Sequence, residues 1–214
     1  MHPLDGRLSD RAGAAGLTVD EGLRRQLLEY YDLLLRWNTR INLTALTDPE
    51  DGIDRLLLEP VAAAASLSTT QGLVDLGSGG GSPAIPLALA LKTPRLLMVE
   101  SKGKKAAFLR EAARTVGLTA DVEAVRFVEL ARRGSLAQAF DLVSVRAVRM
   151  DVEALTAARS FLSASGRIAL FVSQGAMPEL PPGLNLESRS KLLGTAELLR
   201  LRADVPRETS SEKG

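Results

Sequence analysis

The chain has 214 residues and no cysteine, which excludes disulfides, thiolate metal sites and cysteine nucleophiles. Its only histidine is His2, so we expect no histidine metal site and no histidine-based catalytic triad. The formal net charge of +1 argues against a protein that coats nucleic acid through charge alone, although it is compatible with a local basic face. The sequence contains neither a membrane-length apolar run nor a signal-peptide core, so we expect a soluble cytoplasmic protein without a membrane partner.

The first part of the chain is predicted to be helical. Residues 1–17 are rich in Gly, Ala and Arg, and we expect them to be loosely ordered. Thr18 and Glu21 have the spacing of a capping box, in which each side chain bonds the other residue's backbone N–H at the start of a helix. We therefore predict a helical extension over 18–70. Its two expected helices lie at 19–37 and 49–66.

From residue 71 onward, short aliphatic runs alternate with helical stretches. Aliphatic runs without polar alternation are typical of strands that helices cover on both faces, as in a parallel sheet. The expected strands are 73–76, 95–99, 121–125, 140–145 and 167–172, with a closing hairpin at 184–193 and 196–203. The expected helices are 83–91, 103–116, 127–132 and 151–162. We therefore predict an α/β core over 71–205 with a mostly parallel, seven-stranded, Rossmann-like sheet, followed by a polar tail at 206–214.

The segment VDLGSGGGSPAIP (74–86) joins the first expected strand to a helix. Its glycines permit a tight turn and a close approach of the backbone to a ligand. Glu100 ends the next strand, where a carboxylate can accept both hydroxyls of a ribose. The two features together predict a nucleotide-type cofactor site at the carboxyl edge of the sheet. Because Ser82 replaces the third glycine of a dinucleotide fingerprint, a nicotinamide-dependent oxidoreductase remains only as an alternative.

The Asp-x-Gly-x-Gly-x-Gly arrangement that starts at Asp75 resembles the first motif of class I S-adenosylmethionine-dependent methyltransferases. Several segments together resemble one family, the RsmG/GidB methyltransferases, which methylate guanine N7 in 16S ribosomal RNA. These segments are RWNTRINLT (36–44), Arg55, DLGSGGGSPAIP (75–86), ESKGKKAAFLRE (100–111), FDLVSVRAV (140–148) and GRIALFVSQG (166–175). The resemblance implies S-adenosyl-L-methionine as cofactor and ribosomal RNA or the small ribosomal subunit as partner. We expect a monomer, because nothing in this chemistry demands a partner subunit.

The resemblance also implies roles for individual residues. Arg146 is expected beside the cofactor and the target base, and is the one candidate catalytic residue. The implied cofactor-binding residues are Asp75, Gly77, Ser78, Gly79, Gly81, Glu100, Ser101, Phe127, Val128, Glu129 and Arg146. The implied RNA-binding residues are Arg36, Asn38, Asn42 and Arg55. No metal ligand is expected.

The chain departs from the family's pattern mainly where substrate handling is expected. Leu56 stands where the family has histidine, Glu59 replaces aspartate, and Gln174 replaces lysine. Methylation of guanine N7 survives the loss of histidine, because N7 carries a lone pair and no proton, and the reaction requires no general base. An alternative reading is a diverged homologue that binds cofactor or RNA with little or altered catalytic activity.

Overall fold

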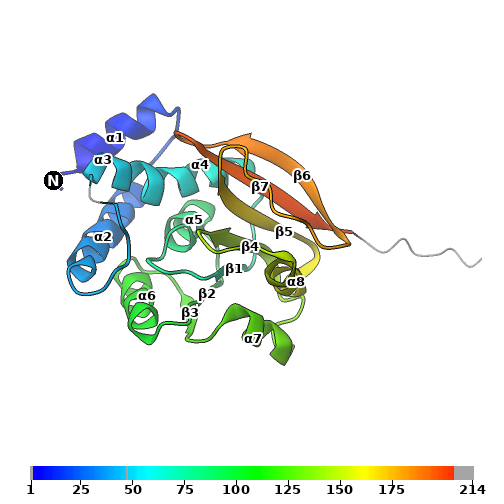
Figure 1. Cartoon of the computed structure of the whole chain (residues 1–214). Helices are drawn as coiled ribbons and strands as arrows, with labels where there is room; N and C mark the ends of the chain where they lie inside the picture. Colours follow the sequence, from blue (N-terminus) through cyan, green and yellow to red (C-terminus); the bar gives the residue numbers. More distant parts are fainter. Residues whose placement is uncertain (1, 47, 205–214) are drawn as a thin grey trace, which may run out of the picture.

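A seven-stranded sheet with the strand order β3-β2-β1-β4-β5-β7-β6 lies at the centre of the protein (Figure 1). The computed structural model describes residues 2–46 and 48–204. The strands are β1 (Leu73–Leu76), β2 (Leu96–Val99), β3 (Ala120–Glu123), β4 (Phe140–Arg146), β5 (Leu162–Ser173), β6 (Leu184–Lys191) and β7 (Ala196–Ala203). Strands β1 to β5 pair in parallel, whereas β7 runs antiparallel to both β5 and β6. The predicted α/β class, the mostly parallel sheet and the closing hairpin are confirmed.

Strands β1 and β2 consist mainly of aliphatic residues because helices bury both faces of the sheet at its centre. Leu73 and Leu96 belong to one buried cluster, while Val74 and Leu97, one residue further along each strand, belong to another. This alternation follows from the two-residue period of a strand. The helices of the core are α5 (Ala84–Leu91), α6 (Gly103–Thr115), α7 (Phe127–Arg133) and α8 (Val152–Ser160). The first cluster holds α5, α6 and the N-terminal helices, and the second holds α7 and α8.

The N-terminal helices pack on the α5–α6 side of the sheet, in the blue and cyan part of Figure 1. They are α1 (Asp5–Ala14), α2 (Glu21–Asn38), α3 (Pro49–Gly52), the π-helical segment η1 (Ile53–Leu58) and α4 (Glu59–Ser66). The last three form one continuous helical run, which agrees with the predicted span of 49–66. A π-helical turn inside an α-helix is rare and occurs often at functional sites. Arg55, a predicted RNA-binding residue, lies on this turn.

The expectation of a loosely ordered start at 1–17 is wrong, because α1 occupies most of that segment. Leu8 and Ala12 of α1 are buried in the main core cluster. Arg11 forms ion pairs with Glu50 and Asp54, which tie α1 to the α3–η1 run. The sequence failed to indicate this helix because its few apolar residues become informative only when the partner surface is known.

The capping box at Thr18 is also wrong. Helix α2 begins at Glu21, and Asp20 is its N-cap, with the Asp20 carboxylate accepting a hydrogen bond of 2.8 Å from the backbone N–H of Leu23. An aspartate caps a helix at least as well as a threonine, so the later residue took the position. The predicted polar tail at 206–214 lies outside the described residues. Among the helices of 2–46 and 48–204, none is both long and apolar enough to cross a membrane.

Candidate active site

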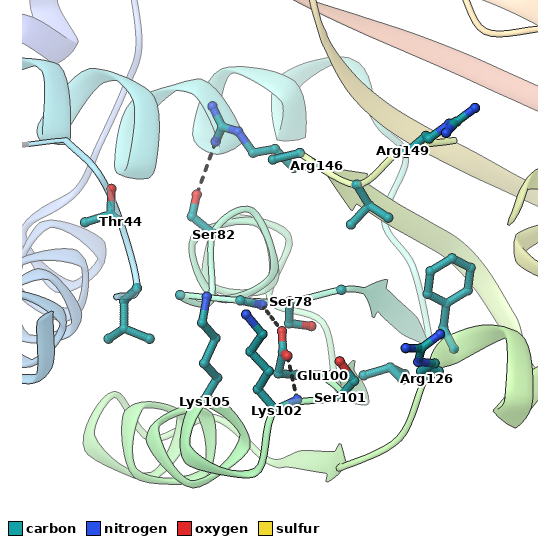
Figure 2. Close-up of a pocket in the computed structure, with 18 of the residues that line it drawn as sticks. Thr44, Ser78, Ser82, Glu100, Ser101, Lys102, Lys105, Arg126, Arg146 and Arg149 are labelled. Atoms are coloured by element: carbon teal, nitrogen blue, oxygen red, sulfur yellow. Dashed lines mark hydrogen bonds between the residues drawn. The ribbon is translucent and has the colours of Figure 1, made fainter. Parts of the chain in front are cut away.

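The glycine-rich connection between β1 and α5 lies at the carboxyl edge of the sheet, where ligands bind in open α/β folds. The backbone N–H groups of Gly77 and Ser78 donate to the Val99 carbonyl at the end of β2, at 2.8 and 3.0 Å. The Glu100 carboxylate then accepts from the N–H of Gly79 at 2.9 Å and from the N–H of Lys102 at 2.8 Å (Figure 2). The first three bonds fix the turn against the end of the neighbouring strand, and the fourth orients the Glu100 carboxylate. The predicted proximity of the glycine turn and Glu100 is thus present in the structure.

Gly77 is required in the turn by both its conformation and its surroundings. Its φ is +75°, in the left-handed region that residues with a Cβ rarely adopt. A Cβ at this position would also lie 2.5 Å from Cγ2 of Val148, which follows β4. The turn therefore brings the backbone close to the β4 end as well as to the β2 end.

Asp75 supports the turn from below and does not face the open space above it. Its side chain is 1% exposed and accepts a hydrogen bond of 2.5 Å from the Ser144 hydroxyl on β4. The Ser78 hydroxyl donates to the Asp75 backbone carbonyl at 3.1 Å, which closes the turn over the strand. Burial raises the pKa of the Asp75 carboxyl to about 6, although hydrogen bonds from Ser144 and Ser78 oppose the shift.

A cavity of about 1050 Å³ opens above the turn, and we call it the first cavity. Nine of the predicted cofactor residues line it: Gly77, Ser78, Gly79, Glu100, Ser101, Phe127, Val128, Glu129 and Arg146. Asp75 and Gly81 are absent from its wall, which corrects the expectation that they face the cofactor. Asp75 points to β4, while a Cβ on Gly81 would meet Ile85, Leu109 and Tyr30 in the core.

The N-terminal extension forms one wall of the first cavity. Leu34 of α2 and the loop residues Leu43 to Leu46 line it. The Tyr30 hydroxyl of α2 donates a hydrogen bond of 2.6 Å to the Gly80 carbonyl in the glycine turn. Tyr30 and Gly80 were not predicted as site residues, because only the fold brings α2 onto the turn. A run of glycines that continues through Gly80 was the one signal available.

The predicted RNA-binding residues do not share one environment. The side-chain oxygen of Asn38 accepts from the backbone N–H groups of Leu43 and Thr44, at 2.8 and 3.0 Å, and so organises the loop that lines the cavity. Arg36 and Asn42 are exposed near this loop. Arg55 is also exposed, but it lines the first cavity and lies some distance along the chain, on η1.

Arg146, at the end of β4, is held in place by a buried ion pair. Its guanidinium contacts Glu59 of α4, and the two side chains are 13% and 4% exposed. It also donates to the Arg55 carbonyl at 2.5 Å and to the Ser82 hydroxyl at 3.2 Å, the latter drawn in Figure 2. Burial raises the pKa of Glu59, while the positive charges of Arg146 and Arg55 act against the shift. The ion pair therefore holds Arg146 at the edge of the first cavity.

A second cavity, of about 640 Å³, lies on the other side of Arg146. It shares Arg55, Arg146, Ala147 and Val148 with the first cavity, so the two spaces adjoin along these four residues, which we call the partition. The rest of its wall comes from the α3–η1–α4 run, from β5, from Met150 after β4, and from the loops after β5 and β6 up to the start of β7. Across the described residues, no cluster of three or more His, Cys, Asp or Glu side chains is arranged to hold a metal ion.

Comparison with known proteins places the chain in one family. The family model GidB, described as rRNA small subunit methyltransferase G, matches residues 23–181. The ribosomal RNA small subunit methyltransferase G of Sorangium cellulosum is 38% identical over 84% of this chain and 76% of its own length. The protein of the same name from Syntrophotalea carbinolica is 33% identical over 77% of this chain and 76% of its own length.

A solved structure of lower identity shares the fold. The Pyrococcus horikoshii TYW2 structure in complex with MeSAdo is 18% identical, with a TM-score of 0.51 over 67% of this chain and 61% of that one. The family assignment rests on the sequence matches, and the structural match agrees with the methyltransferase sheet. The chain belongs to the GidB family of rRNA small subunit methyltransferases.

Proposed function

We propose that the protein transfers a methyl group from S-adenosyl-L-methionine to N7 of a guanine in 16S ribosomal RNA. It acts on ribosomal RNA or the small subunit as a monomer in the cytoplasm. The observation that carries the proposal is the first cavity of a GidB-family chain, in which the glycine turn and Glu100 face Arg146 across one space. The family supplies the reaction class, and the cavity supplies a place for it.

The residues of the first cavity fit S-adenosylmethionine. Its volume of about 1050 Å³ suits a ligand of nucleoside size with an amino-acid tail. Each oxygen of Glu100 accepts one backbone N–H and keeps a further lone pair, so the carboxylate can also accept the two ribose hydroxyls. Phe127 and Val128, at the start of α7, would flank the adenine, and the Gly77–Gly80 backbone would hold the methionine part.

The reaction requires the protein to align the methyl donor with N7 of the base. When bound, S-adenosylmethionine supplies an electrophilic methyl group; the N7 lone pair forms the new bond to carbon while the pair of the broken bond stays on sulfur. No proton moves at N7, so a wall without histidine or cysteine is sufficient for the reaction. Arg146, fixed by Glu59, Arg55 and Ser82, would orient the base in line with the methyl group.

Transfer of a radioactive methyl group from S-adenosylmethionine to purified 16S RNA or small subunits tests this function. We expect incorporation into RNA from cells that lack the gene and none into RNA that already carries the modification. Digestion to nucleosides should place the label in 7-methylguanosine. Absence of incorporation into any RNA, together with tight cofactor binding, would instead support the diverged homologue that binds without catalysis.

Two residues give a physical basis to the alternative of a diverged homologue with little catalytic activity. Leu56 lines the first cavity and provides no polar group there. Gln174, where the family has lysine, is exposed after β5 and carries no charge to hold a phosphate. Because a charged hydrogen bond is worth about 1.5–3 kcal/mol, these changes predict slower transfer by roughly tenfold to a hundredfold. Introducing histidine at Leu56 and lysine at Gln174 should raise the transfer rate if the enzyme is active.

A further inference from the structure

The second cavity differs from the first in the charge of its wall. Seven basic and three acidic side chains line the first cavity, whereas two basic and three acidic side chains line the second. The acidic members of the second cavity are Asp51, Asp54 and Glu59. A wall with this balance disfavours a phosphate group and favours a ligand that presents hydrogen-bond donors. The second cavity is therefore unsuited to the RNA backbone and suited to an uncharged or cationic group.

The apolar part of the same wall is suited to a flat ring. Phe171 of β5, Met150 and Met177 line the cavity. The Phe171 ring is only 6% exposed and the Arg146 guanidinium covers it at 5.5 Å from its centroid, so Met150 and Met177 present the accessible apolar surface. The thioether sulfur of methionine makes favourable contacts with aromatic rings, and its flexible side chain adapts to a flat ligand. Met177, in the loop after β5, is 45% exposed and lies at the rim of this surface.

The three carboxylates of the wall are not equally available. Asp54 binds Arg11 through both of its oxygens, and Glu59 binds Arg146. Asp51 is exposed, and among the described residues its carboxylate has no hydrogen-bond or ion-pair partner. Asp51 is thus the acidic group of the wall that can accept two parallel N–H donors from a ligand.

We propose that the second cavity receives the target guanine base, with its N1–H and 2-amino edge toward Asp51 and N7 toward the partition formed by Arg146 and Val148. This inference rests on the proposed function, because the cavity is assigned to the base that the first cavity's cofactor would methylate. Guanine N7 and the donor edge lie on opposite sides of the ring system, so binding through the donor edge leaves N7 directed at the first cavity. Methylation leaves a positive charge on the base, and the unpaired carboxylate of Asp51 at the donor edge offsets part of it.

The absence of cysteine allows a direct test of the cavity. Met177→Cys places a single thiol at its rim, and Leu186→Cys on β6 is the matched control, because Leu186 is 40% exposed and is not part of the wall. Each variant is labelled with a fluorescein maleimide and assayed for S-adenosylhomocysteine binding and for methyl transfer to 16S RNA. Separately, the alkylation rate of each unlabelled thiol is measured with guanosine or cytidine 5′-monophosphate present.

The inference predicts a separation of the two readouts. Labelled Met177→Cys should bind S-adenosylhomocysteine within about twofold of its unlabelled form yet lose at least about tenfold in methyl transfer, while labelled Leu186→Cys loses neither. Guanosine 5′-monophosphate, and not the cytidine nucleotide, should slow alkylation at position 177. Full transfer by labelled Met177→Cys, or equal alkylation with both nucleotides, overturns the inference. Protection by the guanosine nucleotide in a protein that never transfers methyl groups supports the site and refutes the proposed function.

A second variant tests the carboxylate. Asp51→Asn replaces one of the two acceptors of the donor edge by an amide N–H₂, and should lower kcat/KM for RNA by about tenfold without changing S-adenosylhomocysteine affinity. Asp121→Asn, an exposed aspartate on β3 outside the wall, is the control and should leave both values unchanged. An Asp51→Asn enzyme with wild-type kcat/KM shows that Asp51 does not read the base.

Discussion

The glycine turn and the partition at Arg146 border the same cavity, but they are built in different ways. The turn is held mainly by backbone groups, with Gly77 and Ser78 bonded to Val99 and Gly79 bonded to Glu100. The partition is held by side-chain charge, through an ion pair between Arg146 and Glu59, which are 87 residues apart in the sequence. A turn held by backbone hydrogen bonds can be predicted from the local sequence, because it requires glycine at particular positions. A site held by side-chain ion pairs depends on partners that only the fold brings together.

Arg146→Met tests the Arg146–Glu59 ion pair and should have the largest effect on stability. It leaves the Glu59 carboxylate buried without its partner, and we expect a loss of about 3–5 kcal/mol in the free energy of unfolding, measured with urea. The double variant Arg146→Met with Glu59→Leu should recover most of this loss, because no charge is then left buried. The exposed pair Arg132–Glu153 is the control, and its removal should change stability by less than about 1 kcal/mol. Equal effects at the two pairs would contradict a structural role for burial.

Asp75→Asn tests how the buried carboxyl beneath the glycine turn changes the pH dependence of stability. The folded-state pKa of about 6 lies above the usual 3.8, so the protonated carboxyl stabilises the folded state below about pH 4 and this contribution is lost as the pH rises through 6. Wild type should therefore lose about 2 kcal/mol relative to Asp75→Asn between about pH 4 and pH 7. Unfolding titrations at the two pH values measure the difference. If the stabilities of the two proteins change equally with pH, burial does not raise the pKa of the Asp75 carboxyl.

Two alanine variants separate conformation from crowding in the turn. Gly77→Ala suffers both a φ of +75° and contact with Val148, so we expect it to lose about 2–3 kcal/mol of stability. Gly79→Ala has a φ of +51° and room for a Cβ, so its loss should stay near 1 kcal/mol. Val148→Ala should rescue part of the Gly77→Ala loss and none of the Gly79→Ala loss. Equal losses of stability in both variants would show that the close contact between Gly77 and Val148 does not affect stability.

Tyr30→Phe tests whether the N-terminal extension stabilises the glycine turn. It removes the donor to the Gly80 carbonyl and leaves that carbonyl without its partner on α2. The expected cost is about 1 kcal/mol in cofactor binding, or roughly fivefold in Kd, if the extension helps to shape the turn. Calorimetric titration with S-adenosylhomocysteine measures it. Tyr31→Phe, on the next position of α2, is the control and should leave the Kd unchanged, since it is the Tyr30 hydroxyl and not that of Tyr31 that bonds the glycine turn.

The same difference explains what the sequence alone could predict. The strands, the crossover helices and the link between the glycine turn and Glu100 follow from local patterns, and the structure contains them. Helix α1 and the Asp20 cap were missed, because packing and competition between neighbouring residues decided them. Asn38 was assigned to an RNA-facing surface, yet its side chain organises the loop at 43–44. The second cavity could not be predicted, since its wall joins η1, β5 and two distant loops.

Titration of S-adenosylmethionine into the wild-type protein and a Glu100→Ala variant tests the central claim most directly. The account predicts that wild type binds S-adenosylmethionine and not NADH, and that Glu100→Ala weakens binding by at least about tenfold, because a charged acceptor of the ribose is lost. Glu123→Ala, at the end of the neighbouring strand β3, should bind as wild type does. Preference for NADH, or equal affinity in Glu100→Ala and wild type, would contradict a cofactor seated between the glycine turn and Glu100.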